Sequence, residues 1–406
     1  MKSTFRFLRP FAGILAVQTA FAAIPEVTNV TAVQRADTKF VDITYNVADA
    51  DGDKLKVRVE ISDNAGTVYS VPAFSFTGAI GDAVTPGNGK TITWNAGEDW
   101  DGEYSEQMRV KVIATDTKGF PGLEWGNEVP PGGFLMGQDG GAEGSGPSRH
   151  VNIPWSLWMS KYEITNGQYC EFLNMALAAG KVTRAGTTTY VRAIPIGGWT
   201  EVGLSTLILI GDTRDIRWNV NNFEVVGGKT NFPVSVTWYG ALAFALQYGY
   251  DLPTDAEWEK AARGPDHDDQ GEHWAYPWGN SISGGYANYA NSGDPMADGR
   301  TPVGYYNGNQ IPFGPDTKNA FGLYDLAGNL SEWTRTAPTD LEFYNQVEWL
   351  GSSNHSLTNS SGRITRGGNS SSQSTNNNLK IYYREQMDRN AADSLIGFRV
   401  VRRSNP

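Results

Sequence analysis

The sequence predicts an α+β protein, with an immunoglobulin-like β-sandwich at residues 24–118 and a larger second domain that has little regular secondary structure. Two observations predict this arrangement. Residues 41–47 and 55–61 alternate between apolar and polar side chains, the period of a half-buried strand, and turn clusters separate them as in a sandwich of this length. Beyond residue 130, three amphipathic helices precede a long stretch of turns and short apolar runs.

The three helices are predicted from the spacing of apolar residues and from their end residues. The first follows Thr165 as its N-cap and ends at Gly180, and the second covers about 237–248. The third begins with a capping box, in which Thr254 and Glu257 satisfy backbone amides reciprocally. After the third helix no further helix is predicted, so the remaining chain must pack as irregular structure.

Residues 1–22 have the composition of a secretory signal peptide. Basic residues precede an apolar run at 11–17, and residues 20–22 form an A-x-A cleavage signal. A short membrane anchor is the alternative, although the run is too short to span a bilayer. We therefore expect cleavage near Ala22 and an exported protein, whether periplasmic, at the cell surface or secreted.

The balance of charge and the use of cysteine restrict the classes of partner. The chain has 33 basic and 44 acidic residues and a formal net charge of −11, so we expect no nucleic-acid partner. The single cysteine, Cys170, excludes an internal disulfide and is expected to be a buried apolar residue. Beyond the leader, no segment is long and apolar enough to span a membrane.

Two short segments mark turns and a boundary. Residues 119–130 are rich in Gly and Pro and are predicted to link the two domains. The stretch containing Asp49, Asp51 and Asp53 favours a hairpin turn, because Asp-Gly is a strong turn signal. Its alternate carboxylates also suit Ca²⁺, although the glutamate that closes an EF-hand loop is absent, and both interpretations stay open.

A set of phrases in the second half occurs in a fixed order. They are PGGFLMG at 131–137, YEITNGQY at 162–169, FPVSVTW at 232–238, LPTDAEWEKAARG at 252–264, YPWGN at 276–280, FGLYDLAGNLSEWT at 321–334, RGGN at 366–369 and GFRV at 397–400. In this order they resemble the formylglycine-generating enzyme, or sulfatase-modifying factor, family. The resemblance covers 131–403 and implies a variant of the C-type lectin fold with little regular structure.

The resemblance also implies structural Ca²⁺ in two loops. The implied ligands are Asn288, Tyr289, Asp298 and Arg300 in the first loop, and Gly328, Asn329, Leu330 and Glu332 in the second. Amide, carboxylate and carbonyl oxygens are the ligands that Ca²⁺ prefers, and metal binding would stabilise a domain without disulfides. A solvated loop is the alternative for the first set, and a hydrogen-bonded turn is the alternative for the second.

The chemistry that the resemblance implies is missing from this sequence. The family's oxidases use two thiolates after the Arg-Gly-Gly phrase to bind copper(I), which prefers sulfur ligands, and to engage a substrate cysteine. The corresponding positions are Ser372 and Asn377, and the family's serine after Gly-Gly is Asn369. We therefore expect neither a formylglycine-generating oxidase nor bound copper.

We expect the former catalytic cleft to bind a ligand instead, which makes the protein a calcium-stabilised binding protein. The residues expected to line the cleft are Trp333, Asn369, Ser372, Asn377, Tyr382, Tyr383 and Arg384. A peptide, a glycan or a cell-surface protein is the expected partner. One alternative is a metal-dependent enzyme with non-standard residues, for which the acidic loop with His267 and His273 is a poor iron site. Another is a retroelement-diversified binding protein, because Asn, Ser and Tyr gather in 368–394.

Overall fold

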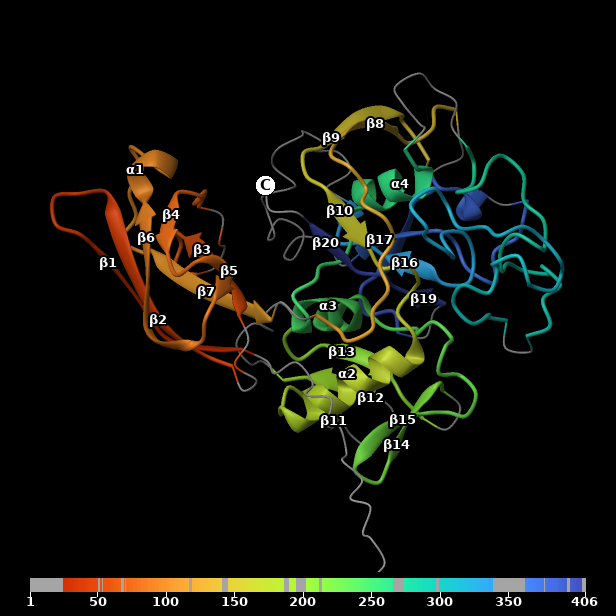
Figure 1. Ribbon diagram of the computed structural model, residues 1–406, viewed down its shortest axis with the longest axis horizontal. Coiled ribbons are helices and arrows are strands. Elements are labelled where there is room, and N and C mark those ends of the chain that lie inside the picture. Colours follow the sequence, from red (N-terminus) through yellow and green to blue (C-terminus); the bar gives the residue numbers. More distant parts are fainter. Residues whose placement is uncertain are drawn as a thin grey trace, which may run out of the picture.

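The structure is a computed structural model with an N-terminal β module beside a larger C-terminal domain (Figure 1). It describes residues 25–403 except for 50–51, 53, 67–68, 70, 117–118, 141–144, 186–189, 195–201, 212–213, 266–273, 297–298, 339–361, 376 and 393–394. The predicted signal peptide, Asp298, His267 and His273 therefore lie outside the described residues. No helix in the described part is long and apolar enough to cross a membrane.

The described strands of the N-terminal module form two antiparallel sheets. The first has the order β1 (Glu26–Gln34), β2 (Phe40–Ala48), β6 (Gly87–Asn95) and β4 (Phe76–Gly78). The second has the order β5 (Gly81–Val84), β3 (Leu55–Ser62) and β7 (Arg109–Asp116). A short helix, α1 (Ala96–Asp99), follows β6.

One apolar core joins these two sheets. Ile43 and Tyr45 of β2 and Trp94 of β6 are buried, and they belong to the same cluster as Leu55 and Val57 of β3. The polar residues between them point away from the core, as period-2 alternation requires. The two predicted strands at 41–47 and 55–61 are thus confirmed as β2 and β3, whereas the immunoglobulin class of the module stays a prediction.

The predicted linker packs against the C-terminal domain. The backbone N–H of Phe120 donates to Tyr250 Oη at 2.8 Å, and the Phe120 ring lies 5.6 Å from that of Phe244 and 5.1 Å from that of Tyr248. Residues 119–130 are therefore packed as the first part of this domain. Their Gly and Pro content predicted a linker and did not indicate that their apolar side chains join its core.

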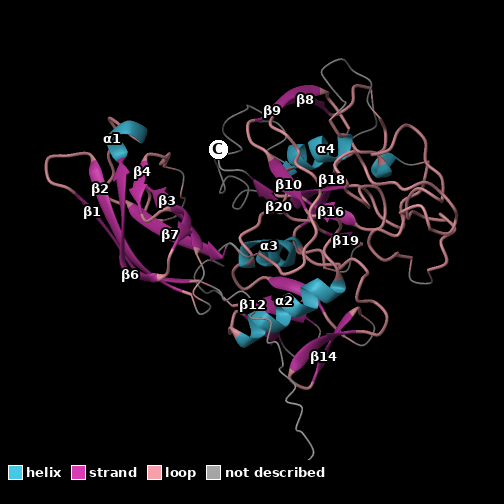
Figure 2. Cartoon of the chain, in the orientation of Figure 1, coloured by secondary structure: helices cyan, strands magenta, loops and turns pink. Residues whose placement is uncertain are grey.

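The C-terminal domain consists of small sheets, few helices and long ordered loops (Figure 2). Its two-stranded sheets pair β8 (Gly132–Met136) with β9 (Arg149–Ile153), β10 (Leu157–Met159) with β20 (Val401–Arg403), and β14 (Ile216–Asn219) with β15 (Asn222–Val225). A three-stranded sheet contains β11 (Val182–Ala185), β12 (Tyr190–Ala193) and β13 (Thr206–Leu209). The last sheet has the order β18 (Glu385–Asp388), β17 (Gly362–Arg366), β16 (Ser331–Trp333) and β19 (Ile396–Gly397).

The three predicted helices are confirmed, and the first and third begin directly after their predicted capping residues. They are α2 (Asn166–Ala178), α3 (Trp238–Gln247) and α4 (Asp255–Arg263), and a 3-10 turn, η2 (Asn377–Leu379), follows much later. Thr165 with Gln168, and Thr254 with Glu257, form capping boxes, while the hydroxyl of Thr237 accepts a bond from the first turn of α3. Each cap satisfies backbone amides that the helix itself leaves without partners.

Two apolar clusters hold this domain together around buried tryptophans. Trp238 of α3 and Trp333 of β16 lie in the cluster that packs α2 and α3 against β13. Trp258 of α4 lies in the second cluster, which packs α4 against β8, β9 and β10. The irregular chain thus acquires a fixed arrangement from these cores, although most of its backbone is loop.

Candidate functional site

The loops that carry the predicted calcium ligands and the former thiol positions meet in the structure. The backbone N–H of Asn329 donates to Asn288 O at 2.9 Å, and that of Ser370 donates to Asn329 O at 2.9 Å. The N–H of Ala290 donates to Ser372 O at 2.8 Å. Backbone hydrogen bonds therefore fix three loops, distant in sequence, as one unit.

Glycine is required where two of these loops cross. A Cβ atom at Gly328 would lie 2.0 Å from the carbonyl oxygen of Asn288. Gly328 has φ of 83° and Asn329 has φ of 60°, in the left-handed region that glycine and asparagine tolerate best. The Gly-Asn pair of the phrase at 321–334 is thereby explained by a close backbone approach.

The side chain of Asn329 is fully engaged within the protein. Its Nδ2 donates to Glu163 Oε2 at 2.8 Å, and its Oδ1 accepts from the N–H of Thr301 at 3.1 Å. The other oxygen of Glu163 accepts from the N–H of Leu330 at 3.0 Å. The Asn329 side chain therefore stabilises a hydrogen-bonded turn, which was the predicted alternative to calcium binding.

Glu332 is likewise paired with protein donors. Arg399 donates from Nε to Oε2 at 2.7 Å and from Nη2 to Oε1 at 2.6 Å, a bidentate ion pair. Trp258 Nε1 donates to Oε2 at 2.6 Å. Both carboxylate oxygens of Glu332 therefore have hydrogen-bond donors. Calcium could bind there only if some of these donors were displaced.

Two further carboxylates lie beside Glu332, and together with Arg399 they form what we call the acidic cluster: Glu163, Asp325, Glu332 and Arg399. Burial, with the nearby charges of Asp325 and Glu332, raises the pKa of Glu163 well above its usual value. Burial also raises the pKa of Asp325 to about 6, although its Oδ2 accepts from the N–H of Gly304 at 2.6 Å. One guanidinium faces three carboxyls, so full ionisation would leave an excess of negative charge, which the raised pKa values of Glu163 and Asp325 reflect.

Glu163 and Asp325 were not among the site residues predicted from the sequence. Each is an acid flanked by apolar or aromatic residues inside a family phrase, and this is the signal that could have found them. Among the described residues, no group of three or more His, Cys, Asp or Glu side chains is arranged to hold a metal ion. The charge of the acidic cluster suits a cation, whereas the present positions of its oxygens serve protein donors.

The first predicted calcium loop is described only in part. Asn288 is buried, and its Nδ2 donates to Gly299 O at 3.0 Å. The Tyr289 carbonyl accepts from the N–H of Ser292 at 2.9 Å, and the Arg300 guanidinium donates to Asp215 at 2.6 Å. Because Asp298 lies outside the described residues, this ligand set stays a prediction.

The segment with Asp49, Asp51 and Asp53, the other candidate for calcium, is also described only in part. Gly52 has φ of 74°, and its N–H donates to Asp49 O at 3.3 Å, which is the geometry of a turn. Asp51 and Asp53 lie outside the described residues. Calcium binding at this hairpin therefore stays a prediction.

A compact polar turn occupies the former thiol positions. Ser372 is only 4% exposed, and its Oγ accepts from the N–H of Asn369 at 3.0 Å. The Nδ2 of Asn369 donates to Ser331 Oγ at 3.1 Å, and Asn377 is half-buried at the start of η2. A hydroxyl and an amide thus stand at these positions, and neither is a ligand that copper(I) prefers.

The other residues expected to line the cleft divide into buried and accessible ones. Trp333 is fully buried, and its Nε1 donates to Val236 O at 2.9 Å. Tyr382 and Arg384 are each 8% exposed, whereas Tyr383 is half-buried. Trp333, Tyr382 and Arg384 are therefore parts of the interior and do not line an open cleft. A tryptophan beside polar residues in sequence gave no sign of its burial.

Arg384 belongs to what we call the arginine-rich cluster: Asp255, Glu259, Arg263, Arg366 and Arg384. The Nε of Arg366 lies 2.5 Å from Asp255, and a second nitrogen contacts Glu259. Arg384 pairs with Asp255 at 2.7 Å and with Glu259 at 3.1 Å. Burial alone would raise the pKa of Glu259, but three neighbouring guanidinium groups outweigh it and lower the pKa to about 2.

A comparison of sequences identifies the family of this domain. The profile of the sulfatase-modifying factor enzyme 1-like domain matches residues 127–404. This chain belongs to the formylglycine-generating enzyme family. Inactive C-alpha-formylglycine-generating enzyme 2 of Bos taurus is 27% identical over 287 residues, which cover 63% of this chain and 88% of that protein.

Other similar proteins include one named formylglycine-generating enzyme and one with a solved structure. The formylglycine-generating enzyme of Thermomonospora curvata is 31% identical over 232 residues, covering 50% of this chain and 69% of that protein. The structure of PvdO from Pseudomonas aeruginosa is 20% identical with a TM-score of 0.42, covering 68% of this chain and 93% of that one.

The only thiol of this family member lies away from the former thiol positions. Cys170 lies on α2 in the cluster that contains α2 and α3. Burial, with the nearby charges of Glu224 and Glu171, raises the pKa of the Cys170 thiol to about 11. Cys170 is therefore buried as expected, and it is a poor nucleophile because the thiolate is the reactive form.

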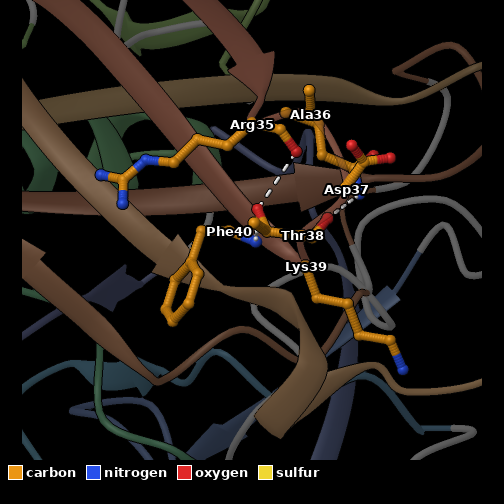
Figure 3. Close-up of a pocket in the computed structure, with 7 residues that line it drawn as sticks. Arg35, Ala36, Asp37, Thr38, Lys39 and Phe40 are labelled. Carbon is orange, nitrogen blue, oxygen red and sulfur yellow. Dashed lines mark hydrogen bonds between the residues drawn. The ribbon is translucent and has the colours of Figure 1, made fainter.

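Two hollows of the surface lie elsewhere. The larger surrounds the turn between β1 and β2 and is lined by residues 34–40, in the N-terminal module (Figure 3). The carbonyl of Arg35 there accepts from the N–H of Thr38, as a turn requires. A small cavity of about 40 Å³ lies against Glu163 and Tyr162. Neither hollow contains a residue of the former thiol turn.

Proposed function

We propose that this chain is a formylglycine-generating enzyme family protein that does not act as an oxidase and instead binds a ligand at the surface around residues 369–383. The observation that carries this proposal is the polar turn at Ser372 and Asn377, where the resemblance implies that the oxidases have thiolates. The similarity to proteins named inactive members supports it.

The accessible residues of this surface have the chemistry of recognition. Ser371, Gln373, Ser374 and Thr375 are exposed, and Tyr383 is half-buried. Hydroxyl and amide groups supply adaptable hydrogen bonds, and tyrosine supplies contact area at a low entropic cost. We propose a peptide, a glycan or a cell-surface protein as the class of ligand, and export as the route by which this protein meets it.

We further propose that Ca²⁺ stabilises the domain at the acidic cluster. The crowding of three carboxyls, Glu163, Asp325 and Glu332, around one guanidinium supports this, because their ionised forms lack a counter-charge that a cation would supply. Carboxylate oxygens from these residues, with carbonyls of Gly328 and Leu330, are of the type that Ca²⁺ prefers. The bound ion would offset charge and tie the loops at 163, 325 and 332 together.

Mass spectrometry of a cysteine-containing peptide tests the absence of oxidase activity. The purified chain is incubated with the peptide, copper(I) and oxygen, and conversion of the cysteine to an aldehyde is followed as a change of mass. The Thermomonospora curvata enzyme serves as the positive control. We expect no conversion by this chain, and conversion above the rate without protein would refute the proposal.

A thermal-shift screen of peptides and glycans tests ligand binding. Ser371→Asp should abolish the shift that a ligand causes, because it places a charge on the exposed part of the surface. Thr28→Asp is the matched control, since Thr28 is exposed in the N-terminal module. Equal ligand-induced shifts in both variants would place the binding site elsewhere.

A further inference from the structure

Two segments, the second of which contains the former thiol positions, have no charged residue. They are residues 274–293 and 367–379, in a chain of which 19% of residues are charged. Apart from the exposed indole of Trp274, their accessible side chains carry hydroxyl or amide groups. These exposed residues are Asn280, Ser281, Ser283, Asn291, Ser371, Gln373, Ser374 and Thr375.

The two segments adjoin in space and rest on one small core. The N–H of Ala290 donates to Ser372 O at 2.8 Å, and that of Ile381 donates to Ala275 O at 2.9 Å. Leu379 is fully buried in a cluster with Tyr276 and Tyr289. We call the two segments together the uncharged surface.

A fixed aromatic group stands on the uncharged surface. The ring of Trp278 is half-buried and lies parallel to that of Tyr276, with 5.8 Å between centroids and 7° between planes. Its Nε1 donates to Ser281 O at 2.9 Å, and the half-buried Tyr286 ring lies 5.7 Å away. The indole is thus oriented before any ligand arrives, which reduces the entropy lost on binding.

We propose that the uncharged surface binds a neutral carbohydrate. This deepens the ligand-binding function proposed above and rests on it. The C–H groups of a sugar ring carry slight positive charge and pack on the negative face of an indole, while its hydroxyls pair with amides and hydroxyls. A charged ligand would find no ionic partner within the uncharged surface, so its desolvation would stay uncompensated. Half-buried aromatic rings with neutral polar neighbours therefore favour a sugar over a charged peptide.

Affinity electrophoresis of the full chain tests this proposal. The gels contain a neutral polysaccharide (dextran, mannan or laminarin) or a charged one (polygalacturonate or heparin). We expect retardation by at least one neutral polysaccharide, and an affinity that stays the same up to about 0.5 M NaCl, where charge interactions are screened. Trp278→Ala should weaken that affinity by about tenfold or more.

Two further variants separate binding from folding. Trp218→Ala removes another half-buried tryptophan, on β14 outside the uncharged surface, and should leave retardation unchanged. Ser283→Asp adds a charge at an exposed position without removing packing, and should also weaken binding while the melting temperature stays constant. Together they distinguish loss of the ligand site from loss of the fold.

Three outcomes would overturn the proposal. They are no retardation in any neutral gel, retardation only by charged polysaccharides that salt removes, and equal losses in the variants of Trp278 and Trp218. If a peptide binds in a manner sensitive to Ser371→Asp while no neutral polysaccharide does, the ligand-binding function stands and the carbohydrate inference fails.

Discussion

Two buried ionic clusters in the C-terminal domain differ in how their charges are balanced. In the arginine-rich cluster, three guanidinium groups face the carboxylates of Asp255 and Glu259, and the pKa of Glu259 is lowered to about 2. In the acidic cluster, Arg399 alone faces three carboxyls, and the pKa of Asp325 is raised to about 6. The same chemical groups at similar burial therefore have opposite tendencies to bind a proton.

The difference shows what each cluster needs in order to stay folded. The arginine-rich cluster contains its own counter-charges and joins α4 to β17 through residues distant in sequence. The acidic cluster can lower its charge only by binding protons or by binding a cation. We therefore expect the first to resist changes of pH and metal, and the second to respond to both.

Removal of one arginine from the arginine-rich cluster should have the largest effect. Arg366→Ala leaves buried Asp255 and Glu259 short of counter-charge, so we expect the free energy of unfolding to fall by about 3–5 kcal/mol. Denaturant unfolding measures this loss. Arg402→Ala, at an exposed arginine over the Trp125 ring, should cost under about 1 kcal/mol. Similar losses in both variants would contradict the importance of the cluster.

Calcium should stabilise the domain through the acidic cluster. At a free calcium concentration 100 times the dissociation constant, the free energy of unfolding should rise by about 2.7 kcal/mol over that in chelator. Elemental mass spectrometry before and after chelation, with melting followed in parallel, measures both occupancy and effect. Melting that chelation leaves unchanged would argue against calcium in this domain, and stoichiometric copper or iron would favour the alternative of a metal-dependent enzyme.

The pH dependence of stability should reveal the acidic cluster. Because the pKa of Asp325 rises from 3.8 to about 6 on folding, the folded state binds more protons than the unfolded state between these values. In chelator, its contribution to the free energy of unfolding should therefore fall by roughly 2 kcal/mol as pH rises through about 4 to 6.

Unfolding curves across this pH range, with and without calcium, measure the fall. Asp325→Asn should reduce it because the substituted side chain does not titrate, and calcium should reduce it by offsetting the charge. The lowered pKa of Glu259 acts in the opposite direction and at lower pH, so the two clusters can be separated. A fall that Asp325→Asn leaves intact would assign it to another group.

Neutralising one member of the acidic cluster should have the smallest effect. Glu163→Gln keeps an acceptor for the N–H of Leu330 but loses the one for Asn329 Nδ2. Relief from the crowding of carboxyl groups offsets that loss, so we expect a change within about 1 kcal/mol in chelator. The same variant should lose most of the stabilisation by calcium. A loss in chelator as large as that of Arg366→Ala would show that the carboxylate of Glu163 is needed as a charge.

Local signals in the sequence predicted much of the fold. The capping boxes at Thr165 and Thr254 lie within single phrases, and the alternation in β2 and β3 is visible in a few residues. The acidic cluster could not be predicted in this way, because residues 163, 325 and 399 are brought together only by tertiary packing. The burial of Trp333 and Arg384 likewise depends on neighbours distant in sequence.

The pairing of β10 with β20 brings the two ends of the family domain together. Leu157 is opposite Arg403 in this ladder and also bridges to Val129, so the start and the finish of the domain are neighbours. A domain whose two ends lie together can be joined to neighbouring chain at a single place on its surface. Such a unit can be inserted into another protein, or joined end to end and reopened at an exposed loop, without altering its interior.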